Sequence, residues 1–136
     1  MSAETDYLRA EGSNTLRSLA IINGLLRKPT RSVYETIALG KLLQDLYSGL
    51  ERVLRTLLAG KGVHTERTAG WHKDLLLAAR QNGLVSDEEF AAFGRLLLFR
   101  HLEVHGYGFT LDDERLVEIA QAVTDICRRF LARLPL

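Results

Sequence analysis

Apolar residues recur every three or four positions along most of the chain, the spacing that places side chains on one face of an α-helix. No segment shows the strict alternation of apolar and polar residues that predicts a strand. The pattern predicts four main helices, which run from Glu4 to Lys28, from Ser32 to Gly60, from Ser86 towards the Gly106–Gly108 break, and onward from Asp112. A short additional helix is predicted from Trp71 to Ala79. We therefore expect an all-α fold, a four-helix bundle with one short extra helix.

Serine and glutamate residues mark the starts of two of these helices. Ser32 is followed three residues later by Glu35, and Ser86 by Glu89, which is the spacing of a capping box. In a capping box the two side chains each bind a backbone N–H group that the first helical turn leaves unpaired. Inside the first helix, the run Gly12–Asn14 consists of poor helix formers, so a bend or a split remains open there.

The second helix carries the longest apolar stripe, and its polar residues lie between the stripe positions. The stripe comprises Val33, Ile37, Leu43, Leu46, Tyr47, Leu50, Val53, Leu54, Leu57 and Leu58. The positions between them include Lys41, Gln44, Asp45, Glu51, Arg52 and Arg55. This arrangement is typical of a bundle helix that buries one face and leaves its charged residues on the other.

The composition is that of an ordinary globular protein, with 46% hydrophobic and 26% charged residues among 136. This length favours a single domain over residues 1–136, with one core. The formal net charge of +1 gives no overall signal for a nucleic acid or a membrane surface. An anionic ligand would therefore have to bind a local cluster of basic side chains.

The single cysteine, Cys127, excludes an intrachain disulfide and favours a reducing, cytoplasmic location. Its place on the apolar stripe of the last helix predicts a small core residue rather than a nucleophile. The chain starts without a basic segment followed by an apolar run, so we expect no signal peptide. No apolar stretch approaches the roughly 20 residues of a membrane-spanning helix, and no membrane association is expected.

Arg100 and His105 form the first candidate site. A histidine can exchange a proton with a ribose hydroxyl or a leaving oxygen while an arginine holds the charge on phosphorus, which suffices for RNA cleavage without a metal. The alternative is a structural role for both residues. Arg100 would then be a surface or ion-paired residue, and His105 would lie at a helix C-terminus, where the helix dipole favours a positive charge. Arg67 and His72 have the same spacing, so spacing alone decides nothing.

Helical geometry places a condition on the pair of Arg100 and His105. A step of five residues along a continuous helix turns the side chain by about 140°, so the two would point in different directions. Either the helix is distorted near Gly106, or a symmetric dimer brings two copies of the pair together.

Other readings of the same stretch concern metal binding. His101 and His105 are four residues apart and could share a helix face, which is a spacing found among zinc ligands. The two histidines lack obvious companions, and a third ligand from His64, His72 or Asp112 would be arbitrary. We therefore predict no metal or other cofactor.

Three further features admit two interpretations each. Tyr107, between two glycines, is either a buried anchor or an exposed phenol available for modification or substrate contact. Trp71 and His72 are predicted to anchor a helix start, with the alternative that His72 joins a site. The arginines at the end of the chain form a solvated helix end or face a phosphate backbone, and they are Arg128, Arg129 and Arg133.

The stretch from Leu98 to Leu111 resembles the signature of the HEPN superfamily, in particular of HepT-like toxins. That signature is an arginine, a polar residue, three more residues, a histidine, any residue and a tyrosine. In this chain the four defined positions are filled by Arg100, His101, His105 and Tyr107. Residues 45–52 and Trp71–Leu76 resemble the same subgroup, so the similarity extends from about Val33 to Phe130.

The resemblance implies a HEPN-type helical bundle and a homodimer in which two Arg/His pairs face each other across a cleft. It also implies a metal-independent endoribonuclease. Arg100 would then stabilise the charge that develops on phosphorus, and His105 would act as the acid or base. His101 would support that pair or contact the RNA.

The resemblance further implies a partner, because HepT-like toxins are paired with a minimal nucleotidyltransferase antitoxin. That antitoxin transfers AMP to the tyrosine of the motif, which is Tyr107 here. A bulky anionic group at this position would exclude RNA and repel its phosphates. The alternative function is a helical accessory module that binds a nucleotidyltransferase without cutting RNA itself.

Overall fold

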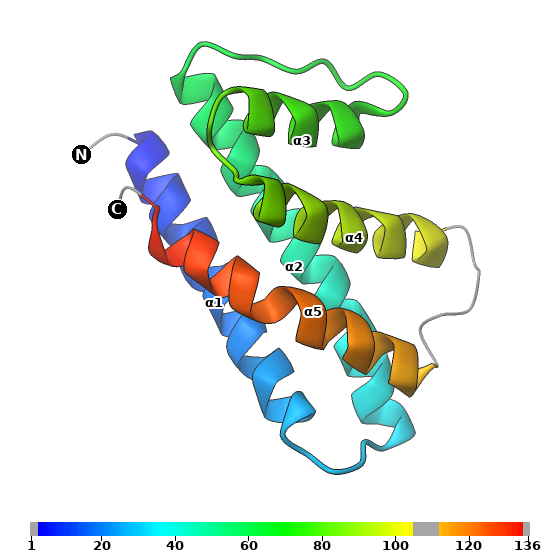
Figure 1. Ribbon diagram of the computed structural model, residues 1–136. Helices are drawn as coiled ribbons and strands as arrows, with labels where there is room; N and C mark the ends of the chain where they lie inside the picture. Colours follow the sequence, from blue (N-terminus) through cyan, green and yellow to red (C-terminus); the bar gives the residue numbers. More distant parts are fainter. Residues whose placement is uncertain (1–2, 105–111, 135–136) are drawn as a thin grey trace.

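The computed structural model describes residues 3–104 and 112–134 (Figure 1). These residues form five α-helices and no strand, which confirms the predicted all-α bundle of four long helices and a short one. The helices are α1 (Ala3–Leu26), α2 (Val33–Gly60), α3 (Trp71–Gln81), α4 (Asp87–Val104) and α5 (Asp113–Ala132). Within the described ranges, no helix combines the length and the apolar character that crossing a membrane requires.

Helix α2 is the central element, because it packs against each of the other four helices. Helix α1 lies along α2 and also contacts α5, while α4 contacts both α3 and α5 (Figure 1). Side chains of α2 can therefore meet side chains from any other part of the bundle. This matters for the site, which combines residues of α2, α3 and α4.

Both predicted capping boxes are present. The backbone N–H of Glu35 donates to Oγ of Ser32 over 3.1 Å, and the N–H of Ser32 donates to Oε1 of Glu35 over 2.9 Å. The same two bonds join Ser86 and Glu89: the N–H of Glu89 donates to Oγ of Ser86 over 3.1 Å, and the N–H of Ser86 donates to Oε1 of Glu89 over 2.8 Å. These bonds satisfy groups that the first helical turn leaves without partners, so they fix the positions at which α2 and α4 begin.

Helix α1 runs without interruption through Gly12, so the split that its weak helix formers allowed does not occur. Gly12 and Thr15 are both buried. Thr15 faces Gly49 of α2 so closely that a Cβ atom at Gly49 would overlap the threonine Oγ1. The close packing of α1 on α2 stabilises the continuous helix and outweighs the local propensity.

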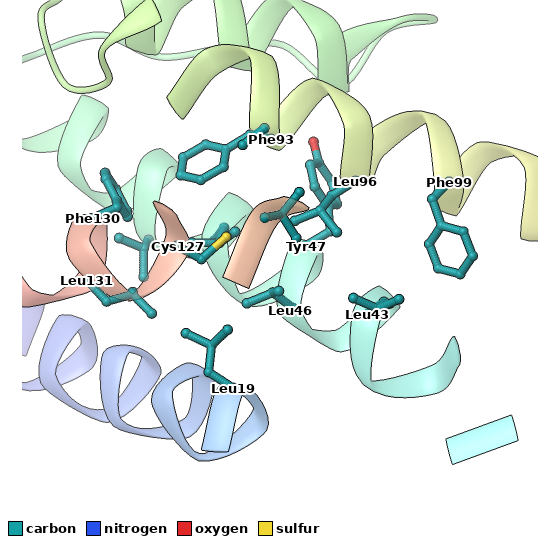
Figure 2. Close-up of a cluster of buried hydrophobic side chains, with 14 of the residues drawn as sticks. Leu19, Leu43, Leu46, Tyr47, Phe93, Leu96, Phe99, Cys127, Phe130 and Leu131 are labelled. Atoms are coloured by element: carbon teal, nitrogen blue, oxygen red, sulfur yellow. The ribbon is translucent and has the colours of Figure 1, made fainter. Parts of the chain in front are cut away.

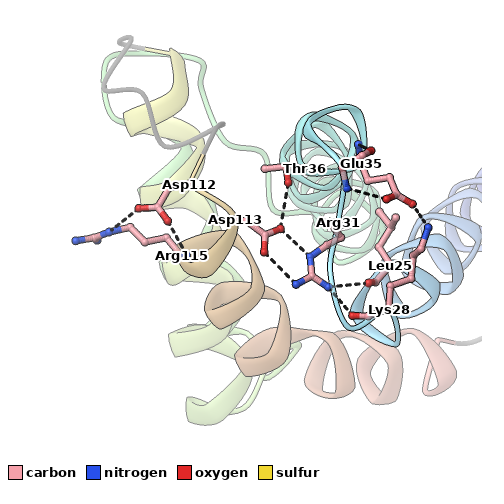
Figure 3. Close-up of polar contacts among 9 residues, drawn as sticks. Leu25, Lys28, Arg31, Glu35, Thr36, Asp112, Asp113 and Arg115 are labelled. Carbon is pink, nitrogen blue, oxygen red and sulfur yellow. Dashed lines mark hydrogen bonds and ion pairs between the residues drawn. The ribbon is translucent and has the colours of Figure 1, made fainter.

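The connection between α1 and α2 is tied to the start of α5 by Arg31 and Asp113 (Figure 3). The nearly buried Arg31 guanidinium donates to both carboxylate oxygens of Asp113, over 2.7 and 3.0 Å. It also donates to the carbonyl oxygens of Leu25 and Lys28, over 3.1 and 2.9 Å. The hydroxyl of Thr36 donates to Asp113 Oδ1 over 3.1 Å. The pKa of Asp113 is lowered below its usual value, mainly because its carboxylate accepts hydrogen bonds from Arg31.

The core lies between α2 and the helices around it, and all five helices contribute to it. Figure 2 shows the part of this core that α1, α2, α4 and α5 form. Its largest fully buried side chains include Ile22, Leu39, Leu43, Leu46, Tyr47, Leu50, Leu54, Leu75, Phe93, Leu96 and Leu116. The rings of Phe93 and Phe130 meet edge to face, with centroids 5.2 Å apart. Cys127 is fully buried in this core, which confirms its predicted packing role.

The predicted stripe of α2 is wrong in its first turns. Val33 and Ile37 are exposed, at 66% and 43%, because the buried face there passes through Thr36, Leu39 and Leu43. Thr36 substitutes for an apolar residue on that face because its hydroxyl is bound by Asp113. The pattern is also wrong at Glu51. It predicts a surface charge there, but Glu51 is buried in the structure.

Candidate functional site

Arg100 lies half-buried on α4, one turn before the described end of that helix. Its Nη1 atom lies 3.4 Å from Nε2 of His72, which belongs to the first turn of α3. The contact joins residues that are 28 positions apart in the sequence. Arg100 is therefore held against an imidazole, at a place where α2, α3 and α4 meet.

Behind His72 lies a carboxylate. Nδ1 of His72 is 2.5 Å from Oε2 of Glu51, and the hydroxyl of Tyr47 donates to the same oxygen over 2.7 Å. Glu51 is only 8% exposed, so its charge is compensated by these donors rather than by water. The four side chains of Tyr47, Glu51, His72 and Arg100 form a connected polar cluster, which we call the Glu51 cluster.

The hydrogen-bond partners determine which imidazole nitrogen of His72 carries the proton. A guanidinium has donors and no acceptor, so Nε2 of His72 must accept the bond from Arg100 with its lone pair. The proton then resides on Nδ1 and is donated to Glu51. The assigned tautomer directs a basic nitrogen lone pair towards the Arg100 guanidinium.

Local structure fixes the ring of His72. Gly70 precedes α3 with a φ of 76°, a left-handed conformation that glycine adopts without strain, and this lets α3 begin at Trp71. The Trp71 and His72 rings lie one over the other, with centroids 3.9 Å apart and planes inclined by 31°. Tyr47 approaches the same imidazole, with ring centroids 6.4 Å apart. The imidazole is thus held by aromatic rings as well as by its hydrogen bonds.

The pKa of Tyr47 is raised far above its ordinary value, because burial disfavours the phenolate and the neighbouring Glu51 charge adds to this effect. The charge of Arg100 acts in the opposite direction. Tyr47 therefore keeps its proton and remains a donor to Glu51.

A groove of about 590 Å³ lies beside the cluster, between α3 and α4. Most of its lining is apolar, and its residues are Gly70, His72, Lys73, Leu76, Phe90, Gly94, Leu97, Leu98 and His101. His72 and His101 thus face one groove from two helices. Lys73 is exposed and supplies a cation at the same edge.

The guanidinium groups of Arg55 and Arg67 lie 5.6 and 5.4 Å from the centre of the Trp71 ring. These are cation–π distances, so both arginines are held close to the start of α3. Arg67 contacts Trp71, while His72 contacts Arg100 on α4. Arg67 and His72 have the same spacing in the sequence as Arg100 and His105, but they contact different partners, Trp71 and Arg100 respectively.

Two of the predicted site residues, His105 and Tyr107, lie outside the described residues. The structure accordingly places Arg100 and His101, on neighbouring positions of α4, and leaves the completion of the motif as a prediction. Glu103 precedes His105; burial raises the pKa of its carboxyl group. Its Oε1 atom is buried and has no hydrogen-bond partner among the described residues. Within those residues, no three His, Cys, Asp or Glu side chains are grouped as a metal site would require.

The arginines at the end of α5 are engaged in ion pairs. Arg128 and Arg129 donate to the carboxylate of Asp125, over 2.7 and 3.0 Å. Arg133 binds the carboxylate of Glu89, the capping residue of α4. These contacts are typical of a solvated helix end, the first of the two interpretations of this cluster.

Sequence reasoning missed Glu51 and Tyr47 as site residues and left His72 as an open alternative. One signal could have found the first two. They are four residues apart on α2 and therefore share the buried helix face, where an isolated carboxylate requires a donor. The same pattern could not reveal His72, because its approach to Glu51 depends on how α3 packs on α2.

Comparison with known proteins yields one family. A family model described as HepT-like protein matches residues 38–134, which include Glu51, His72 and Arg100. No curated protein and no solved structure matches the chain significantly.

Proposed function

The chain belongs to the family of HepT-like proteins, and from this premise we propose that it is a single-domain, metal-independent endoribonuclease toxin of a toxin–antitoxin pair. The observation that carries the proposal is the position of Arg100. This residue of the motif is held beside an imidazole lone pair and next to a groove that His72 and His101 line. An arginine so placed offers its remaining donors to a phosphate.

The proposed roles follow from the chemistry of each side chain. Arg100 stabilises the negative charge that develops on the phosphorus oxygens during cleavage. His105 acts as an acid or a base, and His101 contacts the RNA from the edge of the groove. Lys73, Arg55 and Arg67 add positive charge near the start of α3, which compensates locally for the small net charge of the whole chain.

The active form proposed here is a homodimer in which two Arg100/His105 pairs share one cleft. The turn of about 140° between the two residues on a continuous helix supports a second subunit as the source of the missing group. The exposed Leu98 and the apolar lining of the groove beside it also support an interface near the motif. Light scattering on the purified chain tests this expectation by measuring its mass in solution.

The proposed antitoxin is a minimal nucleotidyltransferase that transfers AMP to Tyr107. AMP would add bulk and negative charge two residues from His105, which would block RNA entry and repel its phosphates. Mass spectrometry of the chain after co-expression with a nucleotidyltransferase encoded beside it should show one added AMP on Tyr107. A Tyr107→Phe variant serves as the control that cannot accept AMP on this hydroxyl.

The central test is cleavage of RNA in the presence of EDTA. Wild-type protein should cut a structured RNA, whereas Arg100→Ala and His105→Ala should each lose activity. Arg128→Ala, which removes an exposed arginine of α5, is the matched control and should cut normally. Equal cleavage by Arg100→Ala would refute the assignment. AMP transfer to Tyr107 together with no cleavage by the unmodified chain would instead indicate the accessory module.

A further inference from the structure

Cleavage of RNA without a metal requires two proton transfers. The ribose 2'-oxygen forms a bond to phosphorus while the bond from phosphorus to the 5'-oxygen breaks. The 2'-hydroxyl must lose its proton and the departing 5'-oxygen must gain one, and side chains have to perform both transfers. The proposed roles assign one such group, His105, so the second remains to be identified.

The described structure places an imidazole directly beside the guanidinium that is proposed to hold the phosphate. The 2'-oxygen lies next to the phosphorus it attacks, so a base for its proton must lie close to the guanidinium that holds the phosphate. Nε2 of His72 is 3.4 Å from Nη1 of Arg100. Its lone pair accepts the N–H of Arg100 in this structure, and it becomes available to the ribose hydroxyl when that N–H turns to the bound phosphate.

Glu51 gives His72 the support that a general base needs. The carboxylate accepts a hydrogen bond from Nδ1–H over 2.5 Å, which fixes the tautomer and stabilises the positive charge that appears when Nε2 takes up a proton. Tyr47 holds the same carboxylate oxygen from the core side. A carboxylate, an imidazole and a hydroxyl to be deprotonated recur in this order in unrelated hydrolases, where geometry defines the roles.

His72 is also accessible, unlike the residues behind it. Its side chain is 26% exposed and lines the groove between α3 and α4, while Glu51 and Tyr47 are buried. The charged and titratable groups around it come from three helices and the loop before α3. They are Tyr47, Glu51 and Arg55 on α2, Arg67 in the loop, Lys73 on α3, and Arg100 and His101 on α4.

We propose that His72 is a catalytic residue of this ribonuclease, the general base that accepts the 2'-hydroxyl proton on Nε2, with Glu51 as its positioning residue. The 2'-oxygen then attacks phosphorus, and the 5'-oxygen leaves with a proton from the acid, the role that His105 takes. This assignment rests on the ribonuclease function proposed above. It pairs the two histidines as base and acid, one from α3 and one from the motif.

The test compares two substitutions of His72 on a short RNA. In His72→Gln the amide can donate to Glu51 and accept from Arg100, but it cannot take up a proton. If His72 is the base, both His72→Gln and His72→Ala lower kcat by about 100-fold or more while KM changes little. The fall of kcat at acid pH, where an imidazole base becomes protonated, should also disappear from the profile of either variant. Wild-type kcat in His72→Gln would overturn the proposal and leave His72 a purely structural role.

His64→Gln is the matched control, because it replaces an exposed histidine in the loop before α3 and should leave kcat unchanged. Should the His72 variants fail to fold, nitrogen-15 NMR of the wild-type imidazoles provides an independent readout. The His72 signals should show the proton on Nδ1, and a proton on Nε2 would overturn the proposal. Two results distinguish a failure of the proposed ribonuclease function from a failure of the proposed role of His72. A wild-type chain that leaves RNA intact refutes the ribonuclease function itself, whereas cleavage that needs Arg100 but not His72 refutes only the base.

Discussion

Oε2 of Glu51 lies 2.5 Å from Nδ1 of His72, and this contact joins the middle of α2 to the first turn of α3. The same oxygen accepts the hydroxyl of Tyr47, so one buried carboxylate organises two donors from different helices. Because Glu51 is the acceptor that both share, it determines the orientation and the tautomer of His72. Its charge therefore affects both the stability of the fold and the state of the site.

Glu51→Gln removes that charge while keeping the size of the side chain. The amide oxygen is a weaker acceptor for Tyr47 and His72, so we expect the free energy of unfolding in urea to fall by about 1 to 2 kcal/mol. RNA cleavage should fall by at least about 10-fold, because a neutral amide no longer stabilises the positive charge that appears on His72 when Nε2 takes up a proton. Glu66→Gln, at an exposed loop position, should change neither quantity. Full activity in Glu51→Gln would contradict the role given to the carboxylate.

Gly49→Ala tests the close packing of α1 on α2. The added methyl group would overlap Oγ1 of Thr15, so we expect a loss of about 1 to 3 kcal/mol in the free energy of unfolding. Gly94→Ala on α4 has open space around its Cβ and should be neutral or stabilise by up to about 1 kcal/mol. A second substitution, Thr15→Ala, should restore part of the loss in Gly49→Ala. Urea unfolding of wild type, Gly49→Ala, Thr15→Ala and the double variant measures this coupling, and purely additive effects would argue against the contact.

Asp113→Asn weakens the tie between Arg31 and the start of α5. Asp113 is 37% exposed, so after allowance for solvent the expected loss at pH 7 is about 1 kcal/mol. The pKa of Asp113 is lowered in the folded protein, chiefly by its hydrogen bond from Arg31. Its contribution is therefore complete above the unfolded value of about 3.9 and is lost as pH falls through the folded pKa. Wild type and variant should converge in stability at acid pH, whereas a constant difference from pH 7 to pH 2 would contradict the prediction.

Cys127 should resist thiol reagents in the native protein. Burial, with a smaller effect of the Glu89 charge, raises the pKa of its thiol to about 12. Only the thiolate reacts, so a disulfide reagent at pH 8 should label native protein at least about 100-fold more slowly than protein unfolded in urea. The chain has a single cysteine, which assigns the signal without a further variant. Equally fast labelling of the native and unfolded states would show that the α5 side of the core is open.

The helices themselves could be predicted from the sequence because their signals are local. A capping box needs only a serine and a glutamate three residues apart, and both Ser32 and Ser86 begin their helices as predicted. The poor helix formers around Gly12 are a local signal that does not predict the structure correctly, because they allow a break in the helix. The helix is continuous because α2 packs closely along α1, and this is a tertiary effect that local propensity does not contain.

The candidate site could be predicted only in part. The motif predicts Arg100 as a site residue, and the structure shows that its guanidinium contacts His72. A helical pattern assigns polar residues to the outer face and therefore predicts Glu51 as a surface charge. Its burial depends on donors from Tyr47 and His72, the second of which is 21 positions away. A contact of this kind is created by the packing of α3 on α2, so it has no counterpart in sequence spacing.

Tyr47 belongs to the core and to the Glu51 cluster at once. Its ring is almost completely buried in the core (Figure 2). Its hydroxyl donates to the carboxylate of Glu51, which lies behind His72. The buried part of the cluster, Tyr47 with Glu51, can therefore open only when the centre of the bundle opens. Amide hydrogens around Tyr47 should exchange with solvent at the rate set by global unfolding, and a local fluctuation that frees His72 should be rare on that timescale. The imidazole of His72 is thus held in place by a carboxylate that is itself anchored in the buried core of the bundle.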